Sequence, residues 1–155
     1  MKMTGAEREY HRKTAARSFN ATWDYLDMKK RTPGQSREML HLAHTSRHHW
    51  GLVGTPRNLA VGDWLLSRVY AELGHPQLAL SFAESALALC EENNLSEIVH
   101  TANEAMARAY AVSGNLPKAR KHLVTARRQL AALSLGKEDR AVFLDQIEQT
   151  QSLIE

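Results

Sequence analysis

The feature that most constrains the fold is a spacing of forty residues between three glycines, Gly34, Gly74 and Gly114, each lying between two stretches of helix-like pattern. Overlaid at this offset, the second and third copies match at Leu66/Met106, Tyr70/Tyr110, Gly74/Gly114, Ala79/Ala119 and Ala86/Ala126. The first copy agrees less well and keeps Leu26, Gly34, Ala43 and Ser46 in register. Self-similarity at such a period is typical of solenoids, in which each unit buries its apolar face against the next. We therefore expect a stack of helical hairpins.

Proline, glycine and the apolar spacing divide the chain into seven expected helices. They span residues 7–30, 35–50, 56–73, 76–92, 96–113, 116–133 and 139–154. Pro33 prevents the first helix from continuing, Thr55-Pro56 forms a helix start, and Gly74 suits a left-handed helix end. In the last segment Phe143, Ile147 and Ile154 share one face, as in a helix that covers an end hairpin. The expected organisation is a single domain with repeats at about 7–50, 56–92 and 96–133 and a capping helix at about 138–155.

Small and aromatic residues within each copy lie where the tetratricopeptide repeat has them relative to its turn glycine. In the third copy these residues are Ala107, Tyr110, Gly114, Ala119 and Ala126, and in the first copy Trp23 and Leu26. Residues 20–130 thus resemble that family, with departures in the longer period and in Ser67 and Asp27, which stand where a small apolar residue is expected. The resemblance implies an all-α, right-handed superhelical array of three helix-turn-helix repeats with a C-terminal capping helix. The stretch from Ser46 to Trp50 also resembles one in bacterial helical proteins, a likeness that adds no mechanism.

The resemblance also implies a function, because tetratricopeptide-like arrays chiefly bind protein or peptide segments on the concave surface built by the first helix of each hairpin. By register the residues on this surface are Asp24, Trp64, Arg68, Glu104 and Arg108. A tryptophan flanked by arginines is typical of interface hot spots and offers bidentate carboxylate binding. We therefore expect a non-enzymatic adaptor or regulatory module whose partner carries an acidic or carboxylate-bearing segment. The opposing interpretation places Trp64 in the core and pairs the arginines with Glu72 and Glu104 on their own helices.

The sharpest chemical pattern is a run of histidines between His41 and Trp50. On a helix His41, His44 and His48 share one face, and hairpin pairing would bring Asp24 and Asp63 towards them. Imidazole with carboxylate can bind zinc or transfer protons, so the alternative function is a metal-dependent or acid–base enzyme. The repeat register places this face outside, and neither a zinc-protease signature nor a cysteine pair accompanies it. A solvated stripe is therefore the favoured interpretation.

Composition narrows the remaining function classes. The 155-residue chain has a net charge of +3, and its basic residues form no single stripe with interleaved aromatics, so we expect no nucleic-acid partner. No phosphate-cradling glycine loop, signal peptide or long apolar run is present, so we expect no cofactor and no membrane association. The single Cys90 suits a buried hydrophobe in a reducing cytoplasm. Exposed repeat ends can also pair, which makes a homodimer a further expectation.

Overall fold

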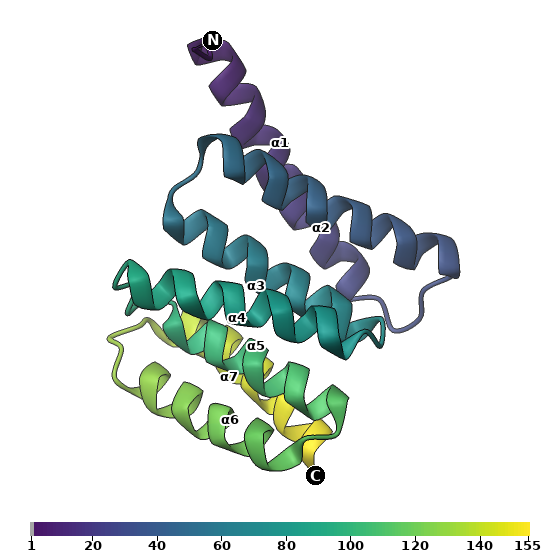
Figure 1. Ribbon diagram of the computed structural model, residues 1–155, viewed down its shortest axis with the longest axis vertical. Coiled ribbons are helices and arrows are strands. Elements are labelled where there is room, and N and C mark those ends of the chain that lie inside the picture. Colours follow the sequence, from purple (N-terminus) through teal and green to yellow (C-terminus); the bar gives the residue numbers. More distant parts are fainter. Residues whose placement is uncertain (1) are drawn as a thin grey trace.

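The computed structural model describes residues 2–155 and consists of seven α-helices, with no strand among those residues (Figure 1). The helices are α1 (Gly5–Leu26), α2 (Pro33–Val53), α3 (Pro56–Glu72), α4 (Pro76–Glu92), α5 (Val99–Ser113), α6 (Leu116–Ala131) and α7 (Lys137–Ile154). The all-helical prediction is confirmed.

Local sequence explains where most of the helices begin. Four of them have proline in the first turn, where the missing N–H has no intrahelical role, at Pro33, Pro56, Pro76 and Pro117. Three begin with a capping box, in which the threonine hydroxyl accepts from the third helical residue and that residue's side chain returns to the threonine N–H, at Thr4, Thr32 and Thr55. These signals are local, so sequence alone locates them.

The structure differs from the sequence-based expectation most clearly at the first connection, where α1 ends at Leu26 rather than near residue 30, and at the start of α5. Gly34 lies in the first turn of α2 rather than in a turn between helices, whereas Gly74 and Gly114 adopt φ angles of 77° and 86°. The first hairpin is joined instead by residues 27–32. Helix α5 begins at Val99 rather than at residue 96, because residues 96–98 form a turn that buries Ile98 in the core.

The helices pack as three successive hairpins, α1 with α2, α3 with α4 and α5 with α6. Helix α2 also contacts α3, α4 contacts α5, and α3 contacts α5, while α7 packs on both α5 and α6. In Figure 1, α1 lies behind α2 and α7 lies behind α5, and the two termini are at opposite ends of the stack. The hairpins thus leave α1, α3, α5 and α7 to form the side on which the candidate site lies.

Alanine lines most of the contacts between helices. Among the described residues, twelve alanines are at most 1% exposed and allow the helix axes to approach closely, namely Ala15, Ala43, Ala60, Ala79, Ala83, Ala86, Ala102, Ala105, Ala107, Ala109, Ala119 and Ala126. Gly62 has the same role between α2 and α3, since a Cβ there would lie 2.7 Å from the Arg47 side chain. A second cluster joins α5 and α6 to α7 through Leu123, Leu130, Ile147 and Ile154. The apolar face of the last helix thus packs against the third hairpin.

Candidate ligand-binding groove

A buried polar network connects α3, α5 and α7. The indole N–H of Trp64 donates to Oε2 of Glu104 over 3.2 Å, and Nε of Arg108 donates to Oε1 of the same carboxylate over 3.1 Å. The hydroxyl of Thr150, on α7, also donates to Oε1 of Glu104. All four residues are buried, so α7 is attached to α5 by charge-assisted hydrogen bonds as well as by apolar packing.

Glu104 is ionised within this network. Burial by itself would raise the pKa of Glu104, but the charges of Arg108 and Arg68 and the hydrogen bonds from Thr150 and Trp64 hold the pKa below its usual value. A buried carboxylate is tolerated only when it is paired and hydrogen-bonded, and both conditions are met here. The network is therefore a structural anchor whose integrity depends on the charge of Glu104.

Arg68 lies one turn beyond Trp64 on α3 and is only 8% exposed. Its guanidinium lies over the Trp23 ring, with Cζ 5.0 Å from the ring centroid, and its Nη2 donates to the amide oxygen of Gln149 on α7. Nη1 has no hydrogen-bond partner. Burial and the neighbouring charge of Arg108 lower the pKa of Arg68 to about 10, so the side chain is a cation at neutral pH with unused donor capacity.

A groove of about 610 Å³ runs between α1 and α7, with the buried side chains of α3 as its floor. It lies on the side of the molecule where α1 and α7 are seen behind the other helices in Figure 1. Aromatic side chains from α1 and α3 form much of its lining, together with polar groups at the floor and rim: Phe19, Trp23, Trp64, Arg68, Asp145 and Gln149.

A second hollow of about 190 Å³ adjoins the groove and is mainly apolar, with Arg57 and Thr101 as its polar lining residues. Phe19 and Trp64 line both spaces, and Val61 and Phe143 also line the smaller one. Cys90 lies at the smaller hollow, where burial, with nearby glutamates, raises the pKa of its thiol to about 11. The predicted buried role of this cysteine is confirmed, and its thiol is not activated for chemistry.

No protein-family model, curated protein or solved structure matches the chain. None of the helices within residues 2–155 is both long and apolar enough to cross a membrane.

The structure brings together four of the five residues expected on the partner-binding surface. Trp64, Arg68, Glu104 and Arg108 are neighbours, but each is less than a tenth exposed, and Glu104 and Arg108 do not line the groove. Asp24 is exposed. The position beside Trp64 that was expected for Asp24 is occupied by Trp23, and the centroids of the two indole rings lie 5.7 Å apart. The longer connection in the first hairpin shifts that copy out of the forty-residue register.

Sequence reasoning missed the contributions of Phe19 from α1 and of Gln149 and Thr150 from α7. A signal for the latter exists in α5, where Glu104 and Arg108 interrupt a run of alanines on a helix that is buried all round. Charged residues on such a helix require polar partners from a neighbour. The polar residues of α7 that lie between its buried Ile147 and Ile154 are the available candidates.

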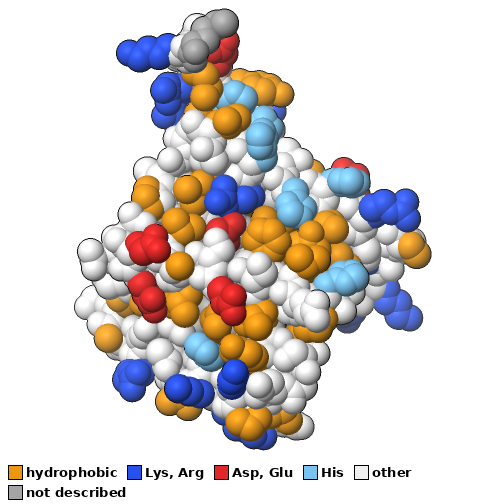
Figure 2. Space-filling model, viewed as in Figure 1, with side chains coloured by type: hydrophobic (Ala, Val, Ile, Leu, Met, Phe, Trp, Pro, Cys, Tyr) orange, Lys and Arg blue, Asp and Glu red, His pale blue; other side chains and the backbone are white. Residues whose placement is uncertain are grey.

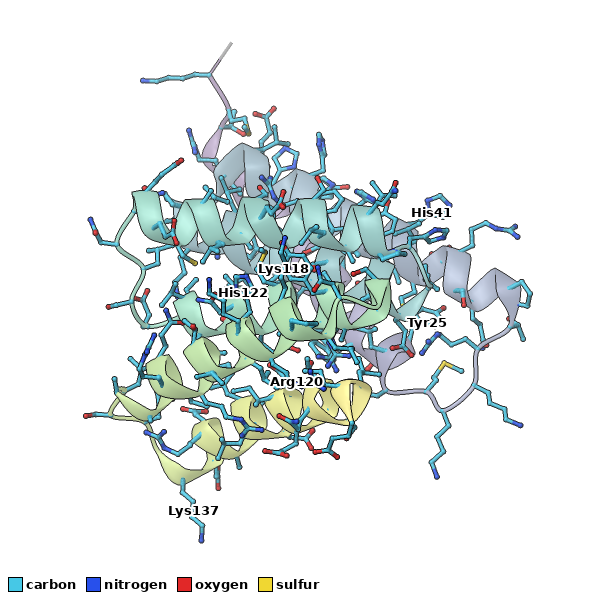
Figure 3. All side chains as sticks on the ribbon, turned by 60° about the horizontal axis from the view of Figure 1, so that its bottom comes forward. Tyr25, His41, Lys118, Arg120, His122 and Lys137 are labelled. Atoms are coloured by element: carbon cyan, nitrogen blue, oxygen red, sulfur yellow. The ribbon has the colours of Figure 1, made fainter. Side chains whose placement is uncertain are left out.

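The histidine stripe lies apart from the groove. Nε2 of His44 is 2.8 Å from the hydroxyl of Tyr70, and the His44 ring contacts Phe82 edge to face. Burial and the neighbouring His41 lower the pKa of His44. Figure 2 shows histidines beside hydrophobic side chains on the face opposite α1 and α7. In Figure 3, His41 lies well away from His122.

The carboxylates expected beside these histidines are elsewhere. Asp63 accepts a hydrogen bond from Nε of Arg47 at 2.8 Å and another from the Ser85 hydroxyl at 2.7 Å. His41, His44 and His48 therefore do not meet Asp63 in a ligand set, and Asp24 is exposed on α1. Within the part of the chain that the structure describes, no three His, Cys, Asp or Glu side chains are arranged to hold one metal ion.

Proposed function

We propose that this chain is a non-enzymatic interaction module that binds a protein or peptide segment in the groove between α1 and α7. The observation that carries the proposal is the groove itself, in which Phe19 and Trp64 join a space of about 610 Å³ with a mixed aromatic and polar lining to a mainly apolar hollow of about 190 Å³. Aromatic side chains beside an arginine are the composition of interface hot spots. The hollow can hold one apolar anchor side chain while the longer groove holds the rest of the segment, which suits an amphipathic peptide.

We further propose that the hairpins form a degenerate tetratricopeptide-like, right-handed array. The Trp64–Glu104 contact between residues forty positions apart supports this architecture, as does the packing of α3 on α5. Helix α7 then forms one wall of the binding groove. A cytoplasmic location agrees with a single, buried, free cysteine.

The experiment is selection of binding peptides from a displayed random library, followed by calorimetric titration of the enriched peptides. Two exposed valines provide matched variants: Val142, at the groove, and Val124, on the outer face of α6. An arginine at position 142 fills the groove with a long charged side chain, whereas one at position 124 extends into water. We expect V142R to weaken binding by at least tenfold and V124R by less than twofold.

Enrichment of no peptide, or equal loss of affinity in both variants, would refute groove binding. Gel filtration of the unliganded protein at several concentrations addresses the homodimer separately, because self-association would appear as a concentration-dependent elution volume.

A further inference from the structure

The floor of the groove carries a cation whose hydrogen-bonding capacity is only partly used. Arg68 is nine-tenths buried, donates from Nη2 to the neutral amide oxygen of Gln149, and has no partner at Nη1. The two terminal nitrogens of a guanidinium are spaced to bind both oxygens of one carboxylate. Gln149 is an exposed, unbranched side chain whose Nε2 also donates to Oδ2 of Asp145 over 2.8 Å, so a ligand that takes its place displaces an amide bonded at both ends. A ligand carboxylate in place of the amide would satisfy both nitrogens.

The charge balance around Arg68 favours a single negative charge. The buried side chains are two arginines, Arg68 and Arg108, and one carboxylate, Glu104. Asp27 and Asp145 also line the groove, but both are exposed. The effective dielectric constant near a protein surface is about 20, so two charges at a given separation interact about four times more strongly there than in bulk water. Arg68 therefore attracts one carboxylate, and the two rim aspartates disfavour a more highly charged anion such as phosphate.

The adjoining hollow specifies the rest of the ligand. An engineered apolar cavity of about 150 Å³ in another protein holds benzene, so the 190 Å³ here accommodates one aromatic ring. Phe19, Trp64 and Phe143 provide aromatic faces and edges for it. Arg68 lines the groove and not the hollow, whereas Trp64, one turn earlier on α3, lines both spaces, so a short ligand that passes Trp64 can reach from one to the other.

We propose that the groove is a binding site for a small aromatic monocarboxylic acid, with its ring in the apolar hollow and its carboxylate on Arg68 in place of Gln149. This goes beyond the proposed function, because a free acid would compete with any peptide for Trp64 and so control partner binding. The site uses no metal and no covalent step.

The probes are 3-phenylpropionate, its neutral amide 3-phenylpropionamide, and butyrate, which lacks the ring. Binding to the full chain is followed through the indole N–H resonances of Trp23 and Trp64. We expect saturable shifts of both resonances with 3-phenylpropionate, and binding at least tenfold weaker for the amide and for butyrate. Equal affinity of the acid and the amide, or shifts confined to resonances outside the groove, would overturn the proposal.

Gln149 provides the matched variants, since its exposure makes substitution safe for the fold. Q149E supplies an internal carboxylate to Arg68 and should weaken binding of 3-phenylpropionate at least tenfold without changing that of the amide. Q149A removes the internal acceptor and should leave the acid bound as tightly or more tightly. Unchanged binding of the acid in Q149E would refute the role of Arg68.

Arg57 is the competing cation, because it lines the rim of the apolar hollow. Arg57→Gln should leave the affinity for the acid within twofold, and a tenfold loss there would place the carboxylate at the wrong end of the groove and overturn the proposal. The two proposals fail separately. If V142R weakens the binding of the selected peptides but the acid does not bind, the proposal of an interaction module stands and the proposal of an acid site fails.

Discussion

Trp64 donates its indole N–H to Glu104, a residue forty positions further along the chain, over 3.2 Å. The same carboxylate is bonded by Arg108 on its own helix and by Thr150 on α7. One buried side chain thus connects the second hairpin, the third hairpin and the last helix. Because α7 forms a wall of the groove, this network connects the stability of the fold to the shape of the candidate site.

Replacing Glu104 with glutamine should strongly destabilise the protein. The substitution leaves the buried Arg108 cation without its carboxylate, and breaking a buried ion pair on one side costs about 3–5 kcal/mol. The measurement is the free energy of unfolding from urea denaturation. Glu84→Gln, at an exposed position on α4, is the control and should change the value by less than about 0.5 kcal/mol. A loss below about 1 kcal/mol for E104Q would contradict an anchoring role.

Thr150→Val should test how α7 is attached. Valine has nearly the same shape, so the fully buried site keeps its packing and loses only the hydrogen bond to Glu104, at a cost of about 1–3 kcal/mol. In a double-mutant cycle with E104Q, we expect a coupling free energy of at least about 0.5 kcal/mol. Thr125→Val removes only a bond within α6 and serves as the control. Strict additivity of T150V and E104Q would show that the two side chains do not interact.

Stability should fall on acidification partly through His100, which is almost completely buried against Phe143 with Nε2 unpartnered. Burial lowers the pKa of His100 in the folded state, although Glu97 and Glu104 partly oppose it. At pH values between the pKa of folded His100 and the unfolded value of about 6.5, the unfolded chain binds more protons than the folded protein. The free energy of unfolding therefore declines as the pH falls below about 6.5 and continues to decline until the folded pKa is passed.

The corresponding variant is His100→Leu, which cannot titrate. Its free energy of unfolding, measured by urea denaturation from pH 7.5 to 5, should vary less with pH than that of the wild type. His75→Leu, at an exposed position between α3 and α4, is the control and should keep the wild-type slope. A slope unchanged in H100L would mean that His100 does not contribute to the acid sensitivity.

Alanine substitutions should separate the three glycines that are spaced forty residues apart. Gly74 and Gly114 have positive φ angles, so alanine there should destabilise the protein by about 1 kcal/mol. Gly34 lies inside the first turn of α2, with no atom closer than 3.9 Å to an added Cβ, so Gly34→Ala should stabilise by about 0.4–1 kcal/mol. Thermal unfolding of the three variants measures both signs. If G34A destabilises the protein, Gly34 lies in a turn between helices and not inside α2.

The helices were predictable because their signals are local. Proline at Pro56, Pro76 and Pro117 and the left-handed glycines Gly74 and Gly114 act within one turn, so the middle of the chain agrees closely with expectation. The first hairpin agrees less well because its connection, residues 27–32, carries no such glycine. Because the forty-residue offset aligned Gly34 with Gly74, it predicted Asp24 as the neighbour of Trp64, whereas the structure has Trp23 at that position.

Residue order alone indicates an all-helical chain and brings Trp64, Arg68, Glu104 and Arg108 into one neighbourhood, since helical period and a forty-residue offset can be read from it. Which of the four side chains are accessible depends on how the helices pack. The docking of α7 buries Glu104 and Arg108 and leaves Arg68 at the floor of a groove lined by Phe19 and Trp23. Such burial depends on contacts between segments distant in sequence, which no local pattern encodes.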